Sequence, residues 1–119
     1  MTLIFVYGTL KRGGSNHSWL AGQRFVGPAR TGPGYVLYEL EGYPGMVMRD
    51  DALEGVSGEV WSVDAECLEG LDRLEGTDEG LYRRVPVALR EPIAEEPVET
   101  YLYLLSVDHC RRLGGDWTG

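Results

Sequence analysis

The chain has 119 residues, enough for one domain with a core of its own, so we expect a single domain over residues 1–119. Its 11 basic and 19 acidic residues give a net charge of -8, which repels phosphate backbones and anionic lipid surfaces, so neither nucleic acid nor a membrane is an expected partner. The sequence contains two cysteines and nothing that resembles a secretory signal or a membrane span, so we expect a reduced, cytoplasmic protein.

The first predicted element is a buried strand, because the apolar run TLIFVY ends at a glycine. The loop that follows, GTLKRGGS, places Gly8 and Gly13 at the spacing of a phosphate-binding loop. Gly14 stands where that loop needs a lysine, so nucleotide binding is not favoured. Lys11 and Arg12 are expected to be solvated flanks of the loop, since long cationic side chains usually point to water.

A short helix is expected next, through Trp19 and Leu20, with Ser15 or Asn16 as its cap. Two strand-like runs and a turn of composition GYPG follow it, at Arg24–Arg30, Tyr35–Leu40 and Gly42–Gly45. The turn leads on to a further predicted strand at Ser57–Asp64.

A longer helix has the strongest signal in the chain. Asp64 can cap its beginning, and four apolar side chains fall at helical spacing to form one stripe that must face a core: Cys67, Leu68, Leu71 and Leu74. Cys67 is therefore interpreted as a small core residue. Gly76 is expected to end the helix, as a glycine just past a helix end usually does.

Two long strands, Tyr82–Arg90 and Glu99–Ser106, complete the predicted elements. Pro86 should lie at a bulge or an unpaired side of the first, since it has no N–H to donate. The segment EPIAEEP between them is expected to be a polar hairpin loop, and the tail GGDWTG shows no regular pattern. More strand than helix indicates an α+β fold in which a mixed sheet curls around an interior.

Glu75 is the best catalytic candidate from the residues alone. It is the last residue of the predicted helix, where backbone carbonyls concentrate negative partial charge and disfavour a carboxylate. Leu71 and Leu74 beside it would add desolvation, which also raises the pKa of a carboxyl group and suits it to general-base catalysis. A solvated helix-end glutamate without a role is the alternative interpretation.

No metal site is predicted. His109 and Cys110 are adjacent, so in a regular strand or helix their side chains point apart.

Read together, several segments resemble the gamma-glutamylcyclotransferase-like family from Leu3 to about Tyr103, closest to gamma-glutamylamine cyclotransferase and its small bacterial relatives. These segments are FVYGTLKRG, Asn16-His17, GYPG, GEVW-x-VD, LDRLEG and the pair Tyr82-Arg83. The resemblance implies a small mixed β-barrel with flanking short helices and a cavity at one end. There a gamma-glutamyl compound would cyclise to 5-oxoproline and release an amine, with no cofactor.

The resemblance places the YG-[ST]-L loop of the family on Tyr7, Gly8, Thr9 and Leu10. Gly8 lacks a Cβ, so the chain can turn sharply and its N–H groups can approach an anion. That anion is either the α-carboxylate of the substrate or the oxyanion that develops on its γ-carbonyl.

The essential acid of the family falls on Glu75, which would serve first as general base and then as general acid. Tyr82 resembles a tyrosine that the family keeps after this acid, and a half-buried strand tyrosine without a role is the alternative. Tyr43 and Pro44 resemble a cavity edge, although a bare turn also explains them. A non-catalytic module that binds a gamma-glutamyl ligand remains the alternative to the enzyme.

Overall fold

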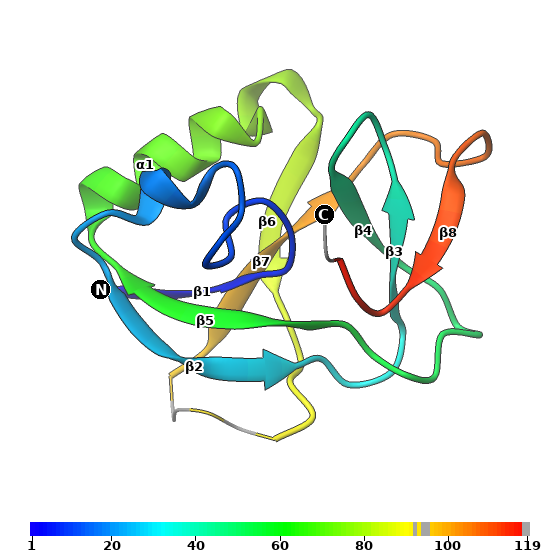
Figure 1. Cartoon of the computed structure of the whole chain (residues 1–119), viewed down its shortest axis with the longest axis horizontal. Coiled ribbons are helices and arrows are strands. Elements are labelled where there is room, and N and C mark those ends of the chain that lie inside the picture. Colours follow the sequence, from blue (N-terminus) through cyan, green and yellow to red (C-terminus); the bar gives the residue numbers. More distant parts are fainter. Residues whose placement is uncertain (92, 94–95, 118–119) are drawn as a thin grey trace.

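The computed structural model describes residues 1–91, 93 and 96–117. In these residues the strands are β1 (Thr2–Val6), β2 (Arg24–Arg30), β3 (Tyr35–Glu39), β4 (Pro44–Met48), β5 (Ser57–Val63), β6 (Tyr82–Pro86), β7 (Val98–Tyr103) and β8 (Arg111–Gly114). One α-helix, α1 (Ala65–Leu74), and two short 3-10 helices, η1 (His17–Leu20) and η2 (Thr77–Glu79), accompany them. In Figure 1, α1 lies along one end of the molecule and β3, β4 and β8 stand at the other.

The described strands form a five-stranded mixed sheet, in the order β2-β5-β1-β7-β6, and a three-stranded antiparallel sheet, β4-β3-β8. Strand β1 is central, antiparallel to β5 and parallel to β7. Beyond the outer strands β2 and β6, one isolated bridge pairs Thr31 with Leu89. The α+β prediction is confirmed. The closed barrel is not, because no ladder among the described residues joins the two sheets.

Several predicted strands differ in extent from those observed. The first of the two long strands, expected to reach Arg90, ends at Pro86, although the Val87 N–H still donates to the Val98 carbonyl at 2.9 Å. Strand β7 covers Val98–Tyr103 instead of Glu99–Ser106. Strands β4 and β8 were not predicted. Strand β4 begins at Pro44 inside the GYPG motif, so the turn is shorter than expected. Residues 92, 94–95 and 118–119, in the predicted hairpin loop and tail, lie outside the described residues.

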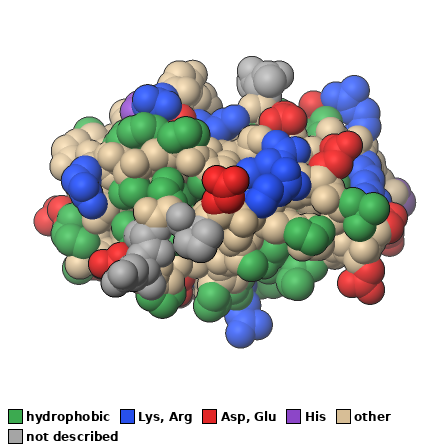
Figure 2. Space-filling view, turned by 90° about the horizontal axis from the view of Figure 1, so that it is seen from below, with side chains coloured by type: hydrophobic (Ala, Val, Ile, Leu, Met, Phe, Trp, Pro, Cys, Tyr) green, Lys and Arg blue, Asp and Glu red, His purple; other side chains and the backbone are tan. Residues whose placement is uncertain are grey.

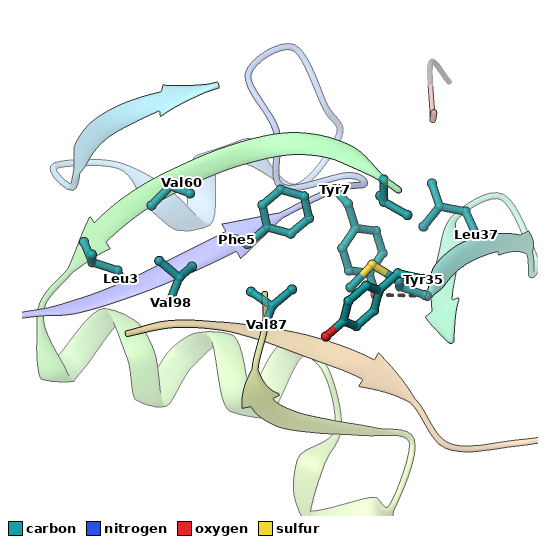
Figure 3. Packing of buried hydrophobic residues seen from close by; sticks show 10 residues of the cluster. Leu3, Phe5, Tyr7, Tyr35, Leu37, Val60, Val87 and Val98 are labelled. Carbon is teal, nitrogen blue, oxygen red and sulfur yellow. Dashed lines mark hydrogen bonds between the residues drawn. The ribbon is translucent and has the colours of Figure 1, made fainter. Parts of the chain in front are cut away.

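Strand β1 places alternate side chains in two different cores. Leu3, Phe5 and Tyr7 point between the two sheets, where they meet side chains of the smaller sheet such as Tyr35 and Leu37 (Figure 3). Ile4 and Val6 point the other way and pack in the cluster that includes Leu71 of α1. Because both faces of β1 are covered, its four buried positions, Leu3 to Val6, are all apolar.

The predicted signals for α1 are confirmed at both of its ends. The Asp64 carboxylate accepts a hydrogen bond of 2.7 Å from the Cys67 N–H at the helix start. Gly76 follows the helix with φ of 65°, and a Cβ there would approach Leu81 Cδ1 to 2.8 Å. Glycine is thus required by both conformation and space.

The expected cap of the first short helix is wrong. That helix is the 3-10 helix η1, and the Asn16 side chain makes no capping hydrogen bond to it. Its amide donates instead to the Thr9 hydroxyl at 3.0 Å, so Asn16 stabilises the loop that precedes η1.

The surface carries charges of both signs. On the face seen in Figure 2, acidic and basic side chains are interspersed with hydrophobic ones. Within the described part of the chain, no helix is both long and apolar enough to cross a membrane.

We predict that Leu71→Ala lowers the free energy of unfolding by about 2–5 kcal/mol, because Leu71 is fully buried between α1 and the larger sheet and its truncation leaves a cavity. Urea denaturation followed by circular dichroism measures the change. Leu53, which is 75% exposed, provides the matched control: Leu53→Ala should change stability by less than about 0.5 kcal/mol. Equal effects of the two substitutions would contradict the proposed packing.

Candidate active site

One pocket lies where β1 ends, and all seven predicted site residues line it. These residues are Tyr7, Gly8, Thr9, Leu10, Tyr43, Glu75 and Tyr82. Phe5, Val6, Pro44 and Tyr101 complete the wall, and the pocket has about 370 Å³ of empty space, part of it open to solvent. The fold therefore brings together residues from β1, the loop after it, the start of β4, the end of α1 and β6.

Tyr101 was missed by the sequence analysis. It lies in an apolar run of β7 whose alternation gives no sign that this residue reaches the pocket.

Glu75 supplies the carboxyl group of the pocket. Glu75 is the C-cap residue of α1, and its backbone N–H donates to the Leu71 carbonyl at 2.9 Å. Burial raises the pKa of the Glu75 carboxyl from its ordinary value of 4.5 to about 7. No hydrogen bond or ion pair of the described residues reaches this carboxylate, and its oxygens keep contact with solvent in the half-buried side chain. An unpaired carboxyl that titrates near neutrality can both accept and donate a proton.

Two tyrosines hold the walls of the pocket through hydrogen bonds to the backbone. The Tyr7 hydroxyl donates to the Tyr101 carbonyl at 2.7 Å and accepts from the Met46 N–H at 3.2 Å. The Tyr82 hydroxyl donates to the Pro44 carbonyl at 3.1 Å, which links β6 to the start of β4. Burial, together with the nearby Glu75 carboxylate, raises the pKa of both phenols, so both stay protonated.

Gly8 makes room for Pro44 across the pocket. A Cβ built on Gly8 would approach Pro44 Cγ to 2.7 Å and Cδ to 2.9 Å, closer than side-chain atoms pack. Glycine is thus required at this position because the proline ring lies so close to it. No hydrogen-bond acceptor for the N–H groups of Gly8, Thr9 and Leu10 is found in the described part of the chain. The three residues that carry these N–H groups all line the pocket.

The loop after β1 is fixed by contacts with distant parts of the chain. The Lys11 ammonium donates to the Trp117 carbonyl at 2.7 Å. The Arg12 backbone N–H and Nε donate to the Glu59 carboxylate at 3.0 and 3.1 Å. The prediction that Lys11 and Arg12 are only solvated flanks is therefore wrong, since both anchor the loop.

A second carboxylate on α1 is paired, in contrast to Glu75. Asp72 accepts hydrogen bonds from the Tyr101 hydroxyl at 2.7 Å and from Arg84 Nε at 3.1 Å. Arg84 also donates to Glu99 at 2.8 Å. This network ties the last turn of α1 to β6 and β7, and it holds Tyr101 beside the pocket. No local pattern in the sequence indicated this network, because its members lie 12 to 29 residues from Asp72 along the chain.

No metal centre is formed by the described residues: no three side chains of His, Cys, Asp or Glu among them are grouped so as to hold an ion.

We predict that ionisation of Glu75 destabilises the folded protein. A carboxyl whose folded-state pKa is raised stabilises the fold fully below the unfolded pKa of 4.5 and loses that contribution as the pH rises through about 7. The stability of the wild type relative to Glu75→Gln should therefore fall by about 3 kcal/mol between pH 4.5 and pH 7 and stay constant above it.

Urea titrations of both proteins at intervals from pH 4 to pH 8.5 measure this difference. Glu79→Gln, at an exposed position, is the control for the removal of a surface carboxylate. A difference between wild type and Glu75→Gln that does not change with pH would show that the carboxyl is not desolvated.

Comparisons with known proteins identify the family of the chain. A family model described as "Gamma-glutamyl cyclotransferase, AIG2-like" matches residues 4–119. A Vibrio cholerae protein named "Putative gamma-glutamylcyclotransferase" is 40% identical, over 97% of this chain and 94% of its own length. The "Gamma-L-glutamyl-butirosin B gamma-glutamyl cyclotransferase" of Niallia circulans is 28% identical, over 98% of this chain and 76% of its own.

The fold agrees as well. The solution structure of the protein ytfP from Escherichia coli superimposes with a TM-score of 0.71 at 33% identity, covering 98% of this chain and 96% of that one. Because the family model spans nearly the whole chain and relatives above 30% identity cover it almost end to end, the resemblance predicted from the sequence is confirmed. The chain belongs to the gamma-glutamyl cyclotransferase, AIG2-like family, and it is an enzyme of the gamma-glutamylcyclotransferase type.

Proposed function

We propose that the protein converts a gamma-glutamyl amine or gamma-glutamyl amino acid into 5-oxoproline and a free amine, with Glu75 as general base and general acid. The observation that carries this proposal is the Glu75 carboxyl, buried in a small pocket, unpaired among the described residues and with a pKa of about 7. Membership of the family supports the reaction class, and the relative from Niallia circulans is named for a reaction on a gamma-glutamyl compound.

The substrate supplies its own nucleophile in this reaction. Its α-amino nitrogen attacks its γ-carbonyl carbon, so one C–N bond forms in the ring and the C–N bond to the departing amine breaks. Glu75 takes a proton from the α-ammonium and then gives one to the departing nitrogen. The carboxyl group thereby returns to its initial protonation state. A pKa of about 7 serves both steps, since neither protonation state is strongly favoured at neutral pH.

The free N–H groups of Gly8, Thr9 and Leu10 are the proposed anion site. They lie in one stretch of backbone that lines the same pocket as Glu75. Such donors suit the α-carboxylate of the substrate, and they equally suit the oxyanion that develops on the γ-carbonyl. Since the loop is anchored through Lys11 and Arg12, these donors are already in place before a substrate binds.

The pocket walls have a positioning role in this proposal. Tyr82 and Tyr7 direct their hydroxyls to backbone partners, so they shape the space in which the glutamyl chain must bend. Ring closure gains most from such confinement, because holding the reacting atoms in place is worth about 7–11 kcal/mol. Tyr43, which is 42% exposed, stands at the open side of the pocket.

We predict that Glu75→Gln folds but loses turnover, because the amide keeps the shape of the side chain and cannot accept a proton. The rate of 5-oxoproline formation should fall by about 10²–10⁴-fold, with an unchanged circular dichroism spectrum. Glu79→Gln, on the exposed 3-10 helix η2, should retain wild-type activity. Retention of more than about a tenth of the rate by Glu75→Gln would rule out Glu75 as the general base.

We predict that a gamma-glutamyl substrate acetylated on its α-amino group is inert, because its nitrogen can no longer attack the γ-carbonyl. The unmodified substrate should yield 5-oxoproline and no glutamate, as measured by mass spectrometry of the products. A hydrolase would release glutamate from the unmodified substrate and acetylglutamate from the acetylated one. That result would show that water, and not the α-amino nitrogen, attacks the γ-carbonyl. A module that binds without turnover would release neither product.

A further inference from the structure

A second hollow adjoins the pocket that contains Glu75, and the two share Gly8 and Thr9. The walls of the second hollow include Lys11, Arg12 and Trp117. A hydrogen bond of 3.1 Å from the Lys11 N–H to the Gly8 carbonyl folds the chain back, so that Lys11 follows directly on the shared edge. The walls of this hollow belong to the loop after β1 and to the segment after β8, which Figure 1 draws in dark blue and in red.

Lys11 is the only lysine in the chain, and its charge is not neutralised by a described residue. Its ammonium donates to a neutral group, the Trp117 carbonyl, at 2.7 Å. Asp116, the neighbour of Trp117, forms no ion pair with it within the described part of the chain. An ammonium has three donors, so two remain for a ligand in the hollow.

Arg12 differs from Lys11 in this respect. Its Nε forms an ion pair of 3.1 Å with Glu59, and its guanidinium carbon lies 3.9 Å from the centre of the Phe25 ring. The charge of Arg12 is therefore balanced and its side chain is held against the protein. Among the described residues, Lys11 is therefore the source of uncompensated positive charge in the hollow, in a protein whose net charge is -8.

We propose that this hollow receives the amine part of the substrate, and that Lys11 makes the enzyme prefer departing amines that carry a carboxylate. The preferred class is then gamma-glutamyl amino acids, over gamma-glutamyl amines whose amine part is neutral or cationic. This inference rests on the proposed function, in which the glutamyl part occupies the pocket of Glu75. The inference takes the N–H groups of Gly8 and Thr9 as binding the oxyanion on the γ-carbonyl. The departing part then extends from these two residues, which the pocket shares with the hollow.

The expected size of the preference follows from the exposure of Lys11. A hydrogen bond to a charged partner is worth more than one between neutral groups, while a half-buried ammonium is partly screened by water. We therefore expect a selectivity of about tenfold, which should shrink as salt is added, because salt screens charges that are open to solvent.

The test compares two compounds that differ in one group, gamma-glutamyl-alanine and gamma-glutamyl-alaninamide. Their kcat/KM values for 5-oxoproline formation are measured with wild type, Lys11→Gln and Arg111→Gln. Arg111 is the charge-matched control, since it lies on β8 with a side chain 71% exposed, and its loss removes one positive charge away from both hollows.

Wild type and Arg111→Gln should prefer the alanine compound about tenfold. In Lys11→Gln the lost bond to the Trp117 carbonyl should lower kcat/KM for both compounds, and the preference should disappear because the alanine compound loses about tenfold more, through its KM. Equal losses on both compounds, or no preference in the wild type, would overturn the assignment of Lys11.

A second measurement separates this inference from the proposed reaction. Because Lys11 is the only lysine, its side-chain methylene next to the ammonium gives a single signal in protein labelled at lysine. In Glu75→Gln, where turnover is removed, gamma-glutamyl-alanine should shift this signal and the alaninamide compound should shift it much less. Absence of a shift with either compound would contradict the site at Lys11. A shift in a wild type that forms no 5-oxoproline would support this binding site and contradict the proposed reaction.

Discussion

The burial of one carboxyl group at the end of α1 is the constraint on which the site depends. Glu75 has a raised pKa because the helix that ends there is pressed against the larger sheet by its apolar stripe, with Leu71 fully buried one turn earlier. Gly76 then turns the chain away in a conformation that favours glycine. If α1 moved outward, water would reach the carboxyl and its pKa would return toward an ordinary value. The packing of α1 against the larger sheet is therefore also what keeps the pKa of Glu75 raised.

Strand β1 carries the second half of the site in the same way. Its alternate side chains are fixed in two cores, so its end is held from both sides, and the loop from Gly8 begins at a defined place. The approach of Pro44 to Gly8 and the bond from Tyr82 to the Pro44 carbonyl then close the pocket from the start of β4. The loop residues after β1 and Glu75 after α1 line one space because each directly follows a rigid element.

Local patterns were sufficient to predict the elements that carry the site, and distant contacts were beyond their reach. The stripe of α1, Asp64, Gly76 and the apolar run of β1 each depend on neighbours in sequence, and each was predicted correctly. Strand β4 was missed because proline and glycine at its start are typical of a turn, whereas burial of its first four residues decided the outcome. The partners of Lys11 and Arg12 lie 106 and 47 residues away, so no spacing rule indicated them.

The two carboxylates at the end of α1 show how one helix separates structural from chemical roles. Asp72 is paired with Arg84 and Tyr101, which fixes the helix to β6 and β7. Glu75, three residues later, has no such partner among the described residues, so its charge carries the full penalty of burial. A cation beside Glu75 would lower its pKa and stabilise the fold, but it would also hold the carboxylate and oppose proton transfer. The network around Asp72 keeps the helix end in place without neutralising Glu75, and this allows a destabilising carboxyl to persist at the site.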